Sequence, residues 1–336
     1  MADLLTISYD LRAPDFGAPQ AEIYRAALDQ AAWADRLGFD AVQVMEHHGS
    51  DDGYLPAPLV FAAAVAARTT RLRIWVSALV LPLHDPVMAA EELAVLDLVS
   101  GGRVTLVVAA GYRLAEFDMF GVDFSSRAAL ADEGIEVMTR AWAGESFSYR
   151  GRSVHVTPRP LQRPRIPIVL GGGSPGSARR AARLADGYRP SRPELVEVYL
   201  EELRRLGKGA PLVPPSLAGH PTAFVSRDVD ATWRAIEAHA LHDTNSYVEW
   251  TRSQPGVYRQ RALARPEDVR TGGGHLVLTP DEAVERVRSG RGLHLKPLLG
   301  GLDPDVSWSS LRVIEEDVLP RLDRPPGGDQ DDATRS

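Results

Sequence analysis

The run Ile166-Pro167-Ile168-Val169-Leu170 leads directly into Gly171-Gly172-Gly173-Ser174-Pro175-Gly176-Ser177, and this stretch decides the fold class. Its first part is almost continuously apolar, which is typical of a parallel strand buried on both faces. Ser174 is a good helix N-cap, and Pro175 suits the first helical position. The stretch therefore predicts a buried strand, a tight turn and a helix.

The same strand–helix unit recurs along the chain. Apolar runs of strand length alternate with segments whose apolar residues recur at steps of three and four. The predicted strands are 4–9, 41–45, 72–81, 104–110, 166–170 and 222–226, with a hairpin near 147–156 and a short segment at 187–190. The predicted helices are 21–37, 59–68, 87–98, 127–143, 177–184, 194–206 and 231–241. This alternation predicts an α/β protein and favours a closed (β/α)8 TIM barrel with insertions over an open sheet.

Residues 1–322 are expected to form a single barrel domain, because such barrels take about 250 residues or more as one unit. The alternation breaks at an insertion of about 242–274, and a loop of that length is either functional or disordered. It is either a solvated insertion or a lid over the barrel mouth. The lid is favoured by the aromatic residues Tyr247, Trp250 and Tyr258. Residues 323–336 are rich in Pro, Gly and Asp and are predicted to be a disordered tail.

The composition excludes several classes of protein. Of the 336 residues, 44% are hydrophobic and 25% charged, and none is cysteine, so disulfides, thiolate metal sites and cysteine nucleophiles are excluded. The first residues do not form a secretory signal, and no apolar run approaches the roughly 20 residues of a membrane span. The formal net charge of −7 speaks against a nucleic-acid partner. We expect a cytoplasmic protein with neither a membrane nor a nucleic-acid partner.

The glycine turn at 171–174 is a candidate phosphate site. Glycines let backbone N–H groups approach a ligand closely, and a helix N-terminus favours an anion. Arg179 and Arg180 lie one turn into the helix and could add positive charge. The alternative is a tight turn without a ligand. Gly171, Gly173 and Gly176 also match G-x-G-x-x-G, but a Rossmann interpretation is disfavoured because the match lies far from the first strand–helix unit.

Glu46-His47-His48 follows the predicted strand 41–45. In a barrel, residues just past the carboxyl end of a strand face the active site, and histidine there can move protons near neutral pH. Adjacent residues near a strand point to opposite sides, so His47 and His48 should not share the pocket or chelate one metal. No metal ligand set is predicted. The alternative for a lone histidine is a structural role.

Together these features resemble the bacterial luciferase-like superfamily of flavin- and F420-dependent oxidoreductases. The resemblance covers roughly 4–187 and returns at 307–322. Its first motifs are Arg36 to Asp40 leading to Glu46-His47-His48, Leu79 to Pro82 with Asp85-Pro86-Val87, and Leu96 to Arg103. The others are Ala110-Gly111-Tyr112 with Glu116-Phe117 and Phe120-Gly121, Gly171 to Pro175, and Asp317 to Pro320.

The resemblance implies a flavin at the carboxyl-end mouth of the barrel and a homodimer. By position, His47 matches the catalytic pocket histidine, and the Gly171-Gly172-Gly173-Ser174 turn matches the phosphate loop. Ser77-Ala78 matches a pair that often carries a non-proline cis peptide under the ring system, and Ala109-Ala110-Gly111 matches another wall of the cofactor site. The substrate pocket is expected to include Tyr9, Met45 and Tyr112.

One position departs from the family pattern. Bacterial luciferase has an arginine on the flavin phosphate near the end of the fourth strand, and the matching residue here is Ala110. The phosphate charge must then be balanced elsewhere, by Arg179 or Arg113. This departure weakens any assignment as a light-producing luciferase.

The implied function is a flavin-dependent monooxygenase that uses reduced FMN and O2 to oxygenate a small organic substrate. The sequence contains no convincing NAD(P)H site, so a separate flavin reductase is expected to deliver reduced FMN. The alternatives are an F420-dependent hydride-transfer enzyme on the same fold and a non-catalytic flavin-binding barrel.

Overall fold

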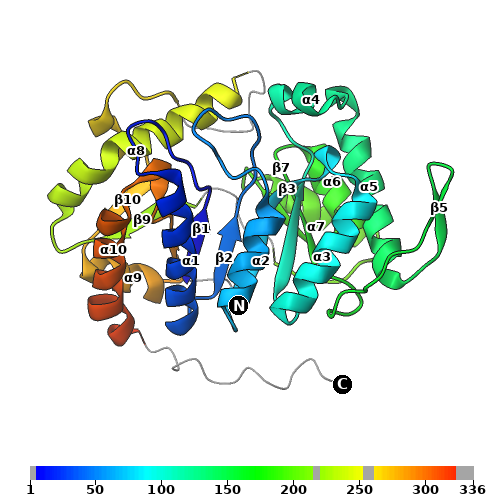
Figure 1. Ribbon diagram of the computed structural model, residues 1–336, viewed down its shortest axis with the longest axis horizontal. Helices are drawn as coiled ribbons and strands as arrows, with labels where there is room; N and C mark the ends of the chain where they lie inside the picture. Colours follow the sequence, from blue (N-terminus) through cyan, green and yellow to red (C-terminus); the bar gives the residue numbers. More distant parts are fainter. Residues whose placement is uncertain (1–4, 215–219, 253–260, 323–336) are drawn as a thin grey trace.

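A computed structural model describes residues 5–214, 220–252 and 261–322 of the chain (Figure 1). Its centre is a nine-stranded, wholly parallel sheet in the order β10-β9-β11-β1-β2-β3-β4-β7-β8. Its strands are β1 (Leu5–Tyr9), β2 (Ala41–Val44), β3 (Arg73–Val80), β4 (Val104–Ala109), β7 (Ile168–Gly172), β8 (Gly187–Pro190), β9 (Thr222–Val225), β10 (His275–Leu278) and β11 (Leu293–Leu295). A separate antiparallel hairpin, β5 (Phe147–Tyr149) and β6 (Arg152–Val154), lies at one side.

Helices connect and surround the strands. They are α1 (Gln20–Arg36), α2 (Pro58–Arg68), α3 (Pro86–Ser100), α4 (Leu114–Phe120), α5 (Arg127–Ala143), α6 (Pro175–Leu184), α7 (Leu195–Arg205), α8 (Val229–Trp250), α9 (Pro280–Arg288) and α10 (Pro304–Val313). Most run alongside the strands, whereas α4 and α8 lie at the end of the sheet where the loops after β1 and β2 emerge (Figure 1). Within the described ranges, every helix is too short or too polar to cross a bilayer.

The sheet curls on itself. Arg189 of β8 donates from Nη1 to Ser77 Oγ of β3 and from Nη2 to Gln43 Oε1 of β2, both at 3.0 Å. Since β4 and β7 separate β3 from β8 in the ladder, these contacts cross the interior of a barrel. Among the described residues no ladder joins β8 to β10, so the hydrogen-bonded order is open at that seam.

Successive residues along each strand lie alternately against the helices and in the barrel interior. Residues such as Ile7, Val44 and Leu106 face the helices and form the main apolar core. The inward face carries a small apolar cluster of Ala41, Trp75, Val107 and Val169. Polar groups share that interior; Thr6 Oγ1, for example, lies 2.7 Å from His294 Nδ1. The barrel interior is therefore chemically suited to a polar ligand near its mouth.

The structure confirms the α/β class and nearly all the predicted elements, but it corrects the insertion at 242–274. Residues 242–250 are not loop: they continue α8 as far as Trp250. His275 to Leu278 form β10, which begins directly after the predicted end of the insertion. Tyr258 and residues 323–336 lie outside the described residues. The single-domain boundary at residue 322 stays a prediction.

Candidate active site

His47 follows the carboxyl end of β2, and strand alternation sets its direction. Gln43 bonds Arg189 inside the barrel, so Met45 and His47, two and four residues on, continue along the same face. Met45 is partly buried. Glu46 instead turns toward the connection after β3, where its Oε2 accepts the Val80 N–H at 2.6 Å. His48 Nε2 lies 2.9 Å from Glu46 Oε1, away from the Tyr112 hydroxyl that His47 meets, which confirms the prediction that His47 and His48 do not face the same pocket.

His47 is held at both ring nitrogens. Nδ1 lies 2.7 Å from Glu116 Oε1, and Nε2 lies 2.9 Å from the Tyr112 hydroxyl. Glu116 is buried and its Oε1 also accepts the His48 backbone N–H at 2.9 Å. A neutral imidazole that donates from Nδ1 to the carboxylate presents Nε2 as the acceptor for the Tyr112 O–H. The arrangement orients one histidine for proton transfer at Nε2.

Aromatic rings surround the His47 side chain. The ring centroids of Tyr54 and Trp250 lie 4.9 and 4.8 Å from that of His47, and those of Tyr112 and Tyr247 lie 5.4 and 6.0 Å away. The Tyr54 and Tyr247 hydroxyls are 2.7 Å apart. Burial raises the pKa of Tyr54, so its phenol stays protonated. His47 is only 6% exposed and therefore lies in a dry, aromatic site.

Two arginines lie over the Trp250 ring. The guanidinium carbon of Arg113 is 4.6 Å from the ring centroid, and that of Arg12 is 5.1 Å from it. Arg113 is fixed because it donates to the backbone carbonyls of His48 and Gly49. These cation–π contacts hold the end of α8 against the strand-end loops.

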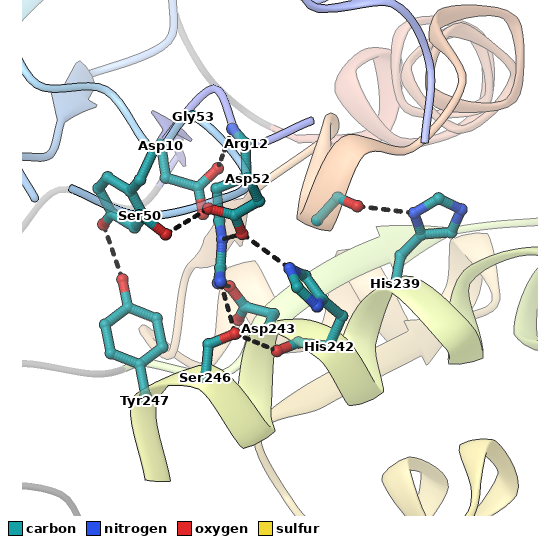
Figure 2. Close-up of polar contacts among 12 residues, drawn as sticks. Asp10, Arg12, Ser50, Asp52, Gly53, His239, His242, Asp243, Ser246 and Tyr247 are labelled. Carbon is teal, nitrogen blue, oxygen red and sulfur yellow. Dashed lines mark hydrogen bonds and ion pairs between the residues drawn. The ribbon is translucent and has the colours of Figure 1, made fainter. Parts of the chain in front are cut away.

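A buried charge network, centred on Arg12, attaches the rest of α8 to the mouth (Figure 2). Arg12 Nε lies 2.5 Å from Asp52 Oδ2, and Arg12 Nη1 lies 3.2 Å from Asp243 Oδ1 on α8. Ser246 Oγ accepts from Arg12 Nη2, and His242 Nε2 lies 2.7 Å from Asp52. Figure 2 shows these α8 side chains facing the loops that follow β1 and β2.

Lys296, just past β11, completes the network. Its Nζ lies 2.7 Å from both Asp10 Oδ2 and Asp243 Oδ1. Burial alone would lower the pKa of Lys296, but the two carboxylates outweigh it and raise that pKa. Burial would likewise raise the pKa of Asp243, but Lys296 and Arg12 lower it to about 2. Asp243 therefore ties α8 to charges from two strand ends.

The predicted glycine turn joins β7 to α6. Ser174 Oγ accepts the Ser177 N–H, and Ser177 Oγ accepts the Ser174 N–H, both at 3.1 Å, which forms a capping box. A Cβ at Gly172 would lie 2.4 Å from Ser177, so only glycine lets the strand and helix approach so closely. The turn thus presents backbone at the mouth of the barrel.

The residues beside this turn fit a phosphate group. Arg192 Nη2 donates to the Gly173 carbonyl at 3.0 Å. Arg192 Nε and Ser191 Oγ are buried and, within the described chain, have no hydrogen-bond partner. Buried polar groups are rarely left unpaired, so two such groups beside a glycine turn indicate room for an oxygen-rich ligand.

The sequence did not point to Arg192, and the positive charge for the phosphate was expected from other arginines. Arg179 is exposed, and Arg180 pairs with Asp132 of α5. The expectation that Arg113 could balance the phosphate is wrong, because its guanidinium is bound at His48 and Gly49. The available signal was topological: Ser191 and Arg192 follow β8, the neighbour of β7.

The other predicted cofactor residues lie along the ends of β3 and β4. The Ser77–Ala78 peptide bond is cis, as the resemblance implied. Ala78, Ala109 and Ala110 are small and partly exposed. Gly111 has φ +80°, and a Cβ there would lie 2.7 Å from Phe117. The small side chains of Ala78, Ala109 and Ala110 leave part of the backbone at the ends of β3 and β4 uncovered.

The structure does not place Tyr9 with these groups. Its ring packs edge-on against Phe61 of α2, and its hydroxyl donates to Gln30 of α1 at 3.3 Å. Tyr9 therefore faces the helices, and the inward position near the end of β1 is Asp10. The expectation that Tyr9 lines the pocket is wrong, whereas Tyr112 does lie beside His47.

Comparison with known proteins agrees with this geometry. A family model described as luciferase-like monooxygenase matches residues 9–294. The chain spans about half the length, 50% and 48%, of two uncharacterised Sinorhizobium fredii proteins to which it is 38% and 31% identical. The F420-dependent glucose-6-phosphate dehydrogenase of Microbacterium testaceum is 27% identical over 88% of this chain and 92% of that protein.

Solved structures share the fold. Monooxygenase RslO1 from Streptomyces bottropensis superposes with a TM-score of 0.74 at 23% identity, covering 94% of this chain and 99% of that one. The oxygenating constituent of 3,6-diketocamphane monooxygenase from the CAM plasmid of Pseudomonas putida, in complex with FMN, gives 0.71 at 18% identity, covering 97% and 100%. These likenesses confirm the (β/α)8 barrel. Since the family match runs from the end of β1 into β11, and so includes His47, Glu116 and the glycine turn, the chain belongs to the luciferase-like monooxygenase family of oxidoreductases.

Proposed function

We propose that this protein is an FMN-dependent monooxygenase that uses O2 to oxygenate a small organic substrate. The observation that carries the proposal is the dry, aromatic-walled position of His47, with Nδ1 held by buried Glu116. Exclusion of water favours oxygenation because it limits wasteful side reactions of activated oxygen. The likeness to an FMN-bound monooxygenase structure supports the same choice.

The chain offers a distinct surface for each part of FMN. Ser191 Oγ, Arg192 Nε and the backbone of 171–173 would bind the phosphate. Ala78, Ala109 and Ala110 would lie against the ring system. When bound, reduced FMN supplies the electrons that activate O2. We propose that a separate flavin reductase delivers it.

The residues around His47 would manage protons. His47 Nε2 and the Tyr112 hydroxyl form a donor–acceptor pair at the open side of the ring. Glu116 would stabilise the imidazolium whenever Nε2 takes up a proton, because its carboxylate bonds Nδ1. Tyr54, Tyr247 and Trp250 would exclude water and contact the apolar part of the substrate.

A second candidate is an F420-dependent hydride-transfer enzyme. It is favoured by relatives named as F420-dependent dehydrogenases that align with most of this chain. The same phosphate-binding residues and His47 would serve either cofactor. The preference of the protein for FMN or F420 is therefore the property that distinguishes the two proposed functions.

Oxygen transfer gives a direct test. The purified protein is mixed with reduced FMN, isotopically labelled O2 and a panel of small aromatic and alicyclic compounds, and products are analysed by mass spectrometry. Label in an organic product supports the proposal. Tight binding of F420 with weak FMN binding and no labelled product would favour hydride transfer. Flavin binding without turnover across the panel, for either cofactor, would favour a non-catalytic barrel.

We also propose a homodimer formed through α2 and α3. Several large apolar side chains are exposed on these helices: Val60, Met88, Val95, Leu98 and Val99. Large apolar side chains exposed on two neighbouring helices are typical of interaction sites. Light scattering should give twice the chain mass for the wild type, and Val95→Glu should shift it toward the monomer. A monomeric wild type would exclude this interface.

A further inference from the structure

Three side chains of types that can ligate a metal ion lie close together next to His47. Glu46 and His48 follow β2, and His84 lies in the connection between β3 and α3. Glu46 Oε1 lies 2.9 Å from His48 Nε2 and 2.6 Å from His84 Nε2. One potential ligand atom from each residue lies within 4.8 Å of the others.

We propose that Glu46, His48 and His84 form a binding site for one divalent transition-metal ion of the Zn²⁺ type. The site is separate from the proposed flavin chemistry and does not depend on it. His47 faces the barrel mouth, whereas Glu46 and His48 face the end of β3 at Val80 and the connection that carries His84.

The donor set and its spacing suit this ion. Zn²⁺ binds imidazole nitrogen and carboxylate oxygen at about 2.0–2.2 Å, which separates tetrahedral ligands by about 3.3–3.5 Å. The present N···O separations of 2.6 and 2.9 Å would therefore widen by less than about 1 Å. Rotation of the partly exposed His84 side chain could widen the His84–Glu46 separation, and the Glu46–His48 pair needs a shift of only about 0.5 Å.

The surroundings already orient the carboxylate. Glu46 Oε2 accepts the Val80 N–H at 2.6 Å, which leaves Oε1 directed between the two imidazoles. A hydrogen bond to the second oxygen of a ligating carboxylate is the support that metal sites use. The Phe120 ring packs edge-on against His48, with centroids 4.7 Å apart, and restricts that imidazole further.

Charge and access also favour a cation. The Glu46 side chain is fully buried and that of His48 is 9% exposed, so a carboxylate charge here needs a nearby positive charge. The His84 side chain is 22% exposed, which provides an entry path and room for a water as the remaining ligand. A bound ion would cross-link the end of β2 to the β3–α3 connection.

Metal binding can be measured directly. The full-length protein, with any histidine tag removed, is treated with chelator, dialysed and titrated with Zn²⁺ in competition with a chromophoric chelator. Co²⁺ serves as a second probe because its visible spectrum reports ligand geometry. We expect one Zn²⁺ per chain and a higher thermal midpoint with Zn²⁺, since an ion that binds the native state stabilises it. The chain has no cysteine to contribute background binding.

Two variants decide between this site and adventitious binding. His84→Gln should weaken Zn²⁺ affinity by at least about tenfold and abolish the thermal shift, since a ligand is lost. His155→Ala, which removes an exposed histidine of the hairpin, is the matched control and should bind like the wild type. Equal affinity in His84→Gln and wild type, or no stoichiometric binding by the wild type, would overturn the proposal. Far-ultraviolet circular dichroism establishes that each variant is folded, and Glu46→Gln provides a second ligand variant if His84→Gln is not.

Discussion

His47 Nδ1 lies 2.7 Å from Glu116 Oε1, although the two residues are 69 positions apart and belong to different strand–helix units. The contact joins the end of β2 to α4. When His47 Nδ1 donates its proton to the Glu116 carboxylate, Nε2 is the nitrogen that faces the mouth. The orientation of His47 therefore depends on a residue outside the Glu-His-His motif.

Replacing Glu116 by glutamine should reduce turnover without loss of the cofactor. The amide preserves shape but cannot stabilise an imidazolium, and loss of such a partner reduces kcat by about 10²–10⁴-fold. Turnover is measured with the substrate identified by the labelling screen, and FMN affinity by fluorescence quenching. Nitrogen NMR of His47 should also show an altered tautomer population.

Glu133→Gln is the control for that experiment, since Glu133 forms an exposed pair with Arg150 far from His47. It should turn over like the wild type. If Glu116→Gln kept both wild-type turnover and the wild-type His47 tautomer, the orienting role of Glu116 would be wrong.

Arg192→Gln should weaken FMN binding far more than riboflavin binding. Only FMN carries the phosphate that Arg192 Nε would bind, and a hydrogen bond to a charged group contributes about 1.5–3 kcal/mol, or roughly 10–100-fold in affinity. Titration of both flavins into the same variant separates the phosphate contact from damage to the ring site. Arg179→Gln, on the exposed face of α6, should leave both affinities unchanged. Equal losses for FMN and riboflavin would place Arg192 outside the phosphate site.

Asp243→Asn should strongly destabilise the fold. The substitution leaves Lys296 and Arg12 buried with fewer negative charges, and breaking a buried ion pair costs about 3–5 kcal/mol. Urea unfolding at neutral pH measures the difference. Asp29→Asn, in an exposed pair with Arg68, should cost less than about 1 kcal/mol.

The loss of unfolding free energy caused by Asp243→Asn should also become smaller at acid pH. The folded-state pKa of Asp243 is lowered to about 2, so its contribution is present above its ordinary pKa of about 4 and is lost as pH falls toward 2. Wild type and variant should therefore converge in unfolding free energy between about pH 4 and pH 2. A difference that stayed constant over this window would show that the Asp243 charge is not responsible.

Replacement by alanine should have opposite effects on protein stability at two glycines of the 171–176 turn. At Gly172 a Cβ would lie 2.4 Å from Ser177, and such overpacking costs about 1–3 kcal/mol. At Gly176 the nearest atom would be 3.7 Å away, and the position lies in the first turn of α6, so alanine should be neutral or stabilising by up to about 1 kcal/mol. Thermal unfolding of the two single variants tests the pair, and FMN affinity should fall only for Gly172→Ala. Equal stability of both variants would contradict the close strand–helix approach.

The fold and one end of the site could be predicted because their signals are local. Apolar periodicity identified β1, β2, β3, β4, β7 and β9, and alternation past β2 separated His47 from His48. The contacts that complete the site are not local. Glu116 lies on α4, a helix of only seven residues, which is too short for periodicity to reveal.

The extent of α8 was missed for a different reason. Polar residues at 242–246 indicate solvent exposure in a pattern analysis, yet Asp243 and Thr244 are buried. Asp243 is buried because Arg12 and Lys296 neutralise it, and those partners come from distant segments. Tyr9 was misplaced because the direction of each residue in β1 depends on which face of the strand the helices cover.

The division of α8 into two parts has a consequence for how this protein can diversify. The turn around Asp243 carries the ion pairs, while the last turn carries Tyr247 and Trp250, whose rings meet His47. Substitutions in the last turn can change the surroundings of His47, while the ion pairs at Asp243 keep α8 in register with the strand ends. Substitutions at Trp250 lose its contacts with Arg12 and Arg113, but the ion pairs at Asp243 still hold α8, so this helix end is where related lineages should diverge first.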